Sequence, residues 1–199
     1  MLVIRRLKHD EKTAILDLGR QVFREEDEIP LLRKAIAQCV LDLSFVALEA
    51  NEIIGFALVC KEATKYYYDF MRKIPNCYEF AFLGISPKAQ GRGLGTKLMK
   101  ESLFAIFNRT KSFTCWLLVD VINTGAIRLY EKMGFRQWYS TTPDITPCPG
   151  YIMGISTRNY TRVHHAHPFH LSSSSSSSII KHIMPSHSQL RQKHCVTII

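Results

Sequence analysis

The sequence predicts a mixed α/β (α+β) fold, in which helices flank one central sheet, and three observations support it. Short apolar runs typical of strands are interspersed with segments whose apolar residues recur three and four positions apart, as in amphipathic helices. The 199 residues are 46% hydrophobic and 22% charged, which suits one soluble globular domain. From about residue 157 the periodicity ends. We therefore expect one folded domain over residues 1–156 and a disordered tail over residues 157–199.

The expected helices are recognised by their apolar spacing and their terminal residues. Asp10 is a good N-cap for the first helix, and a second begins near Pro30. Asn123 is a good N-cap for the last, and Gly134 is a natural residue just beyond its end. The expected helices cover about residues 10–22, 30–43, 94–107 and 123–133.

The expected strands are short apolar runs bounded by turn residues. Two of them form a hairpin around Asn51-Glu52, and the run over residues 113–121 is apolar enough to be buried on both faces. Residues 61–76 fit either a helix or an ordered loop. The expected strands are residues 2–7, 44–50, 53–60, 78–86, 113–121, 135–139 and 151–155.

The net charge of +9 is unevenly distributed, because five of the excess basic residues lie beyond Asp144, the last acidic residue. A mildly basic body suits an anionic cofactor or reflects ordinary surface lysines. The basic residues are scattered, so we expect no nucleic-acid partner. The N-terminus turns polar too early for a signal peptide, and no apolar run approaches the ~18 residues of a membrane span. We therefore expect no membrane association and a cytoplasmic or nuclear location.

The cysteines and histidines do not indicate a metal site. None of the six cysteines forms a CxxC pair, and Cys39, Cys60 and Cys115 lie in apolar runs typical of buried free thiols. Seven of the eight histidines lie in the predicted tail beside a run of seven serines, residues 172–178. This composition predicts disorder, so we expect neither a disulfide framework nor a metal site.

The most informative segment is a strand that leads through a glycine-rich loop into a helix. This layout points successive backbone N–H groups and the positive end of the helix dipole at one spot, where phosphates bind. The order Gly95-Thr96-Lys97 does not fit a Walker A loop, and the GxGxG spacing from Gly91 misses the dinucleotide fingerprint GxGxxG. The alternative is a glycine-rich turn without a ligand.

Two motifs resemble those of the GNAT acetyltransferases. Gln90-Gly-Arg-Gly-Leu-Gly95 is similar to the family's Q/R-x-x-G-x-G/A signature, which binds the pyrophosphate of coenzyme A. Asn123-Thr-Gly-Ala-Ile-Arg-Leu-Tyr-Glu-Lys-Met-Gly-Phe135 is similar to N-x-x-A-x-x-L-Y-x-x-x-G-F. The resemblance is specific over residues 82–135 and implies a mostly antiparallel sheet. Residues 82–87 and the glycine loop resemble most the puromycin-acetyltransferase-like members.

The resemblance implies acetyl-CoA as the co-substrate and assigns roles to individual residues. Tyr130 matches the tyrosine that protonates the departing thiolate. Glu79 is a candidate general base; Asp120 or a chain of water molecules are the alternatives. If side chains alternate along the strand, Glu79 shares a face with Ala81, Leu83 and Ile85. The implied coenzyme-binding residues are Leu83, Gly84 and Ile85 for the pantetheine arm and thioester, Gln90, Gly91, Arg92, Gly93, Leu94, Gly95 and Thr96 for the pyrophosphate, and Asn123 near the thiol.

The implied function is transfer of an acetyl group from acetyl-CoA to a primary amine of a small molecule or peptide, by direct attack in a ternary complex. One alternative is a protein N-terminal or lysine acetyltransferase. Another is a non-catalytic acetyl-CoA-binding module that acts through a partner. We expect a monomer or a homodimer. The aromatic residues Tyr66, Tyr67, Tyr68 and Phe70 either line the acceptor pocket or pack a surface helix against the body.

Overall fold

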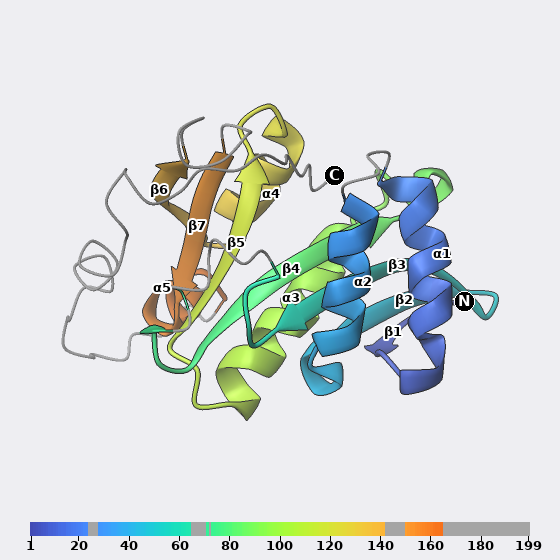
Figure 1. Cartoon of the computed structure of the whole chain (residues 1–199), viewed down its shortest axis with the longest axis horizontal. Helices are drawn as coiled ribbons and strands as arrows, with labels where there is room; N and C mark the ends of the chain where they lie inside the picture. The colour runs from blue at the N-terminus through green and yellow to red at the C-terminus, as the bar shows by residue number, and fades with distance from the viewer. Residues whose placement is uncertain (24–27, 65–70, 72, 142–149, 165–199) are drawn as a thin grey trace.

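The computed structural model describes residues 1–23, 28–64, 71, 73–141 and 150–164. Its sheet has seven strands in the order β1-β2-β3-β4-β5-β7-β6 (Figure 1). The strands are β1 (Leu2–Arg6), β2 (Phe45–Glu49), β3 (Glu52–Cys60), β4 (Cys77–Ile85), β5 (Thr114–Asp120), β6 (Arg136–Thr141) and β7 (Gly150–Ser156). The pair β4–β5 is parallel and the other described pairs are antiparallel. The predicted mixed, mostly antiparallel sheet is therefore confirmed.

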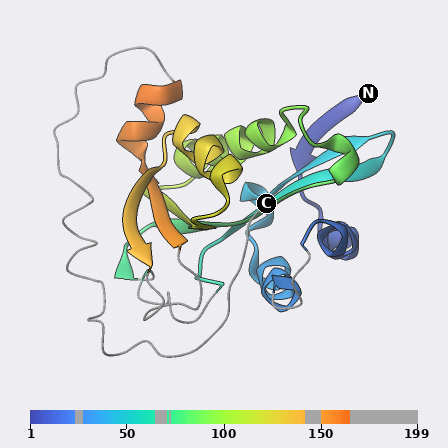
Figure 2. The same ribbon diagram turned by 90° about the horizontal axis from the view of Figure 1, so that it is seen from above.

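Helices cover both faces of the sheet (Figure 2). The helices α1 (Lys12–Val22) and α2 (Glu28–Gln38) lie on one face, and α3 (Leu94–Arg109) and α4 (Thr124–Lys132) lie on the other. Each face has its own apolar core. Leu18 and Leu32 pack with Phe56 on the first face, whereas Leu98 and Met99 pack in the core of the second. The glycine-rich loop therefore leads from β4 to the face opposite α1 and α2.

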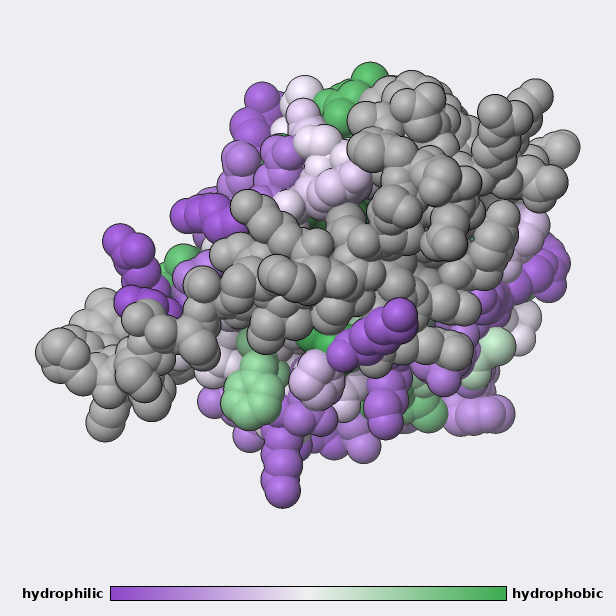
Figure 3. Space-filling model, turned by 60° about the vertical axis from the view of Figure 1, so that its left-hand side comes forward, coloured by the Kyte–Doolittle hydropathy of each residue, from purple (hydrophilic) through white to green (hydrophobic). Residues whose placement is uncertain are grey.

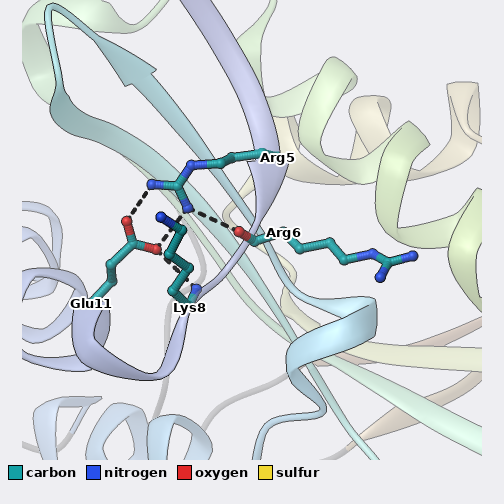
Figure 4. A network of polar contacts seen from close by, with 4 residues as sticks. All are labelled: Arg5, Arg6, Lys8 and Glu11. Carbon is teal, nitrogen blue, oxygen red and sulfur yellow. Dashed lines mark hydrogen bonds and ion pairs between the residues drawn. The ribbon is translucent and has the colours of Figure 1, made fainter.

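The N-terminal helices differ from the prediction at their ends. Asp10 is not an N-cap, because it lies in the short 3-10 helix η1 (His9–Glu11) and α1 begins at Lys12. Figure 4 shows the reason, since Glu11 accepts hydrogen bonds from the guanidinium of Arg5 (2.9 Å) and the backbone N–H of Lys8 (2.9 Å). Arg5 lowers the pKa of the Glu11 carboxyl. The start of α1 is thereby fixed to β1.

The second helix is shorter than predicted. It ends at Gln38, and the chain then returns to the sheet, where Cys39 forms an isolated antiparallel bridge with Cys60. Leu43 lies in the 3-10 helix η2 (Leu41–Leu43) instead of the helix. Cys60 and Cys115 are buried free thiols, as predicted, whereas the free thiol of Cys39 is only half-buried.

The first eight residues of the predicted tail are helical. Helix α5 (Thr157–His164) follows β7, and its Tyr160 is buried against Phe107 with ring centroids 4.9 Å apart. The ring of His164 also packs against that of Tyr160, with centroids 4.7 Å apart. The sequence did not predict this helix because its two turns carry only two apolar residues, Tyr160 and Val163. Residues 165–199 lie outside the described residues, so disorder there stays a prediction.

The described surface in Figure 3 is largely hydrophilic, and its apolar side chains are separated from one another. The large apolar side chains that are most exposed in the described chain, apart from Met1, are Ile122 and Phe113. No helix among the described residues combines the length and apolarity needed to cross a membrane. Within the same residues, no three His, Cys, Asp or Glu side chains gather as a potential metal site.

Candidate active site

The two central parallel strands separate after a short paired stretch. Only residues 77–79 of β4 pair with residues 114–116 of β5, although β4 continues to Ile85 and β5 to Asp120. Figure 1 shows the two strands diverging toward their carboxyl ends. Beyond Glu79 and Trp116 the facing backbone edges are too far apart to hydrogen-bond to each other. The gap exposes polar groups of the strand that carries the predicted pantetheine-binding residues, Leu83–Ile85.

The glycine-rich loop opens a helix, as predicted. Gly91 and Gly93 both have φ of +73°, a conformation that favours glycine, and Gly93 is the N-cap of α3. A Cβ atom at either position would meet no protein atom within 4 Å. The first turn of α3 holds no acidic residue, and its cap provides no side-chain acceptor for the first N–H groups. The loop thus combines open space with unsatisfied donors, which suits a phosphate group.

The side chains of the loop have protein partners of their own. Arg92 forms a bidentate ion pair with Glu49 at the end of β2, with distances of 2.9 and 2.5 Å. This pairing lowers the pKa of the Glu49 carboxyl and raises that of Arg92. Gln90 Nε2 donates to the carbonyl of Ile85 at 3.3 Å. Backbone N–H groups, rather than these two side chains, are therefore left to bind an anion.

Packing at Gly95 brings the two sequence motifs together. The position of its absent Cβ lies 3.5 Å from Leu83 of β4 and 3.5 Å from Leu129 of α4. Leu83, Leu94 and Tyr130 belong to one core cluster. Gly84 faces the other way, where an added Cβ would lie 2.7 Å from the ring of Phe56. The structure thus places the glycine loop, the separated part of β4 and helix α4 side by side.

Helix α4 carries two buried polar groups without partners among the described residues. Asn123 is its N-cap, as predicted, and accepts a hydrogen bond from the backbone N–H of Ala126 at 3.0 Å. The remaining Nδ2 group of Asn123 and the phenol oxygen of Tyr130 are buried and have no hydrogen-bond partner in the described part of the chain. Burial raises the pKa of the Tyr130 phenol well above its ordinary value. Tyr130 therefore keeps its proton at physiological pH.

Glu79 lies at the closed end of the gap, on the face opposite the glycine loop. The pairing of β3 with β4 shifts by one residue at Ala81, which forms a bulge. Ala81 and the partner of Glu79, Cys60, pack in the core under α1 and α2, whereas Leu83 and Ile85 pack under α3. The expectation that Glu79 shares a face with Leu83 and Ile85 is therefore wrong, because the bulge interrupts the alternation. Of these three residues, Ala81 alone lies on the same face of the sheet as Glu79, as expected.

The two candidate bases have different surroundings. Glu79 is 3% exposed, and Thr64 donates to both of its oxygens. No sequence motif identifies Thr64, which lies 15 residues before Glu79. Asp120 accepts a hydrogen bond from the backbone N–H of Ile122 at 3.0 Å and shapes the turn into α4. The aromatic residues 66–68 and 70, proposed for the acceptor pocket, lie outside the described residues.

Two curated proteins of similar sequence are acetyltransferases. Mycothiol acetyltransferase of Acidothermus cellulolyticus is 47% identical over 60 residues, which is 30% of this chain and 18% of that protein. N-alpha-acetyltransferase 30 of Xenopus laevis is 27% identical over 135 residues, which is 66% of this chain and 46% of that protein. The chain therefore spans less than half the length of either relative.

A solved structure has the same fold. The PaiA N-acetyltransferase of Thermoplasma acidophilum, in complex with coenzyme A, matches with a TM-score of 0.58 and 17% identity over 78% of this chain and 99% of that chain. The model of the acetyltransferase (GNAT) family matches residues 12–135, which include both motifs and the separated strands. This chain belongs to the GNAT acetyltransferase family.

Proposed function

We propose that this chain is an acetyl-CoA-dependent N-acetyltransferase that acts on a primary amine of a small molecule or peptide. The observation that carries the proposal is the anion-binding start of α3 beside the gap between β4 and β5. The buried, unpartnered polar atoms of Asn123 and Tyr130 lie on the helix that packs against this start. A glycine turn without a ligand would require neither the open space at Gly91 and Gly93 nor two buried polar atoms that lack described partners.

The residues present fit coenzyme A. When bound, acetyl-CoA supplies an acetyl thioester that an amine can attack with loss of the thiol. The backbone N–H groups from Gly93 to Thr96 would hold the pyrophosphate. The separated edge of Leu83–Ile85 would hold the pantetheine arm, and Asn123 Nδ2 would donate near the thiol end. The likeness in fold to a structure that contains coenzyme A supports this assignment.

The two catalytic roles fall to residues on opposite faces of the sheet. Tyr130 is the general acid, because its buried phenol stays protonated and can give that proton to the departing sulfur. Glu79 is the general base, which takes a proton from the acceptor amine directly or through water. Because the bulge at Ala81 places Glu79 on the α1–α2 face, the acceptor approaches from that face. Asp120 is less suited because its carboxylate stabilises the turn before α4.

The comparisons favour two classes of acceptor amine, a peptide N-terminus and a small-molecule amine. The likeness to N-alpha-acetyltransferase 30 covers more of this chain and favours a peptide N-terminus. The likeness to mycothiol acetyltransferase covers the shorter segment and favours a small-molecule amine. The resemblance of the glycine loop to puromycin-acetyltransferase-like members also points to a small molecule.

A binding and turnover experiment tests the proposal. Calorimetry of the full chain with coenzyme A measures binding, and thiol release from acetyl-CoA measures turnover with small amines, peptides with free N-termini, and N-terminally blocked peptides that contain lysine. We expect binding together with turnover of one of these classes. Binding without turnover of any class would favour the non-catalytic module, and absence of binding would overturn the site assignment.

A further inference from the structure

Thr64 donates a hydrogen bond to each oxygen of the Glu79 carboxylate. The backbone N–H of Thr64 donates to Glu79 Oε2 at 2.7 Å, and the Thr64 hydroxyl donates to Glu79 Oε1 at 3.0 Å. Both side chains are buried, with exposures of 4% for Thr64 and 3% for Glu79. Each carboxylate oxygen therefore has its own donor, and the plane of the carboxylate is fixed. Hydrogen bonds from two donors also favour the ionised form of a buried carboxyl group.

Thr64 is itself held in place by the residues before it. Gln38 at the end of α2 donates from Nε2 to the carbonyl of Glu62 at 3.1 Å. Ala63 is buried in a cluster with Cys77 and Trp116, which flank Glu79 along β4 and across on β5. The segment that follows β3 is thus fixed on both sides, so the two donors of Thr64 keep their direction toward Glu79.

Three buried thiols among the described residues interact electrostatically with Glu79. They are Cys60 across on β3, Cys77 on the same strand and Cys115 on β5, and burial raises the pKa of all three thiols. These thiols are therefore neutral near pH 7. On α2, Lys34 interacts electrostatically with Cys60. The two hydrogen bonds from Thr64 stabilise a negative charge on Glu79.

We propose that Thr64 is a positioning residue that favours the ionised form of Glu79 and aims its Oε1 atom as the proton acceptor; this rests on the base role of Glu79 in the proposed function. The backbone N–H can only donate, so Oε2 remains an acceptor in both protonation states. The hydroxyl can donate or accept, so it rotates when Oε1 gains a proton and then accepts from it. The proton leaves the amine nitrogen, and its electron pair stays on that nitrogen for the attack.

The test compares three variants in the full chain. Thr64→Val removes the hydroxyl at nearly constant volume, Thr64→Ser keeps it as the matched control, and Glu79→Gln removes the base. The pKa of the Glu79 carboxyl is measured in the ligand-free protein by ¹³C NMR, and the pH profile of kcat/KM is measured in parallel. The affinity for coenzyme A should be unchanged in all three variants, because the proposed coenzyme site lies at the start of α3, on the face of the sheet opposite Glu79.

We expect Thr64→Val to raise the carboxyl pKa of Glu79 by about one unit or more, because it loses a charge-assisted hydrogen bond. The acidic limb of the kcat/KM profile should move to higher pH by the same amount, while Thr64→Ser stays close to the parent. If Thr64→Val does not fold, Thr64→Ala serves in its place.

Two results would overturn the inference in distinguishable ways. If Glu79→Gln abolishes turnover but the hydroxyl-free variant leaves both the NMR pKa and the acidic limb unchanged, the role of Thr64 is wrong and the base role survives. If Glu79→Gln keeps full turnover, the base role falls and the positioning role falls with it, whereas coenzyme binding and acetyl transfer still stand.

Discussion

Removing helix α5 should destabilise the domain, although the sequence predicts a folded domain that ends at residue 156 and a disordered tail beyond it. The change is a chain that ends after Ser156, compared with one that ends after His164. The shorter chain loses Tyr160, which is 5% exposed and packs against Phe107. It also loses Val163, whose Cγ2 lies 3.1 Å from the Cβ position of Gly134 at the end of α4.

The size of the effect follows from the buried aromatic ring. Deleting a large buried aromatic side chain costs about 3–5 kcal/mol, and for a domain of this size about 1 kcal/mol changes the melting temperature by roughly 2–4 °C. We therefore expect the chain ending after Ser156 to melt at least ~6 °C below the chain ending after His164. Circular dichroism during heating measures the melting temperatures of both truncated chains. Tyr160→Ala in the full chain should reproduce most of the decrease in melting temperature. Equal melting temperatures for the two truncated chains would refute the reasoning.

Three further substitutions test the site. Gly93→Asp should weaken coenzyme A binding about tenfold or more in calorimetry, because it adds a negative charge at the anion site. The control Gly93→Asn is similar in size and tolerates positive φ, so it should bind coenzyme A more tightly than the Asp variant. Gly84→Ala should lower the free energy of unfolding by about 1–3 kcal/mol in a urea titration, because its Cβ meets the Phe56 ring, and Phe56→Leu should recover part of it. Tyr130→Phe should lower kcat by roughly 10- to 1000-fold with little change in coenzyme affinity or stability, and an unchanged kcat where chemistry limits the rate would remove the acid role.

The parts of the site that the sequence predicted depend on local interactions. The positive φ of Gly91 and Gly93 follows from a short loop at a helix start, and the bond from Ala126 to Asn123 spans three residues. Such features are fixed by neighbours in the chain, so motif and capping rules detect them. The start of α3 at Leu94 was predicted for the same reason.

The parts that the sequence did not predict depend on contacts between distant segments. The bulge at Ala81 is set by pairing with β3, and every residue from Phe80 to Leu83 is apolar, so no alternation reveals which face each side chain takes. For the same reason the face of Glu79 was misassigned. Thr64 lies in the connection between β3 and β4, 15 residues before Glu79. No motif in that connection reveals the contact between the two residues.

The short pairing of β4 with β5 has a consequence for how the molecule holds together. Three residue pairs are the hydrogen-bonded connection between a four-stranded half-sheet, β1 to β4, and a three-stranded half-sheet formed by β5, β7 and β6. A ligand lying in the gap would touch both halves and join them where the backbone does not. Such a ligand stabilises the folded chain by mass action, by about 2.7 kcal/mol at one hundred times its Kd. A supply of acetyl-CoA well above its Kd would then slow the unfolding and the proteolysis of the folded chain.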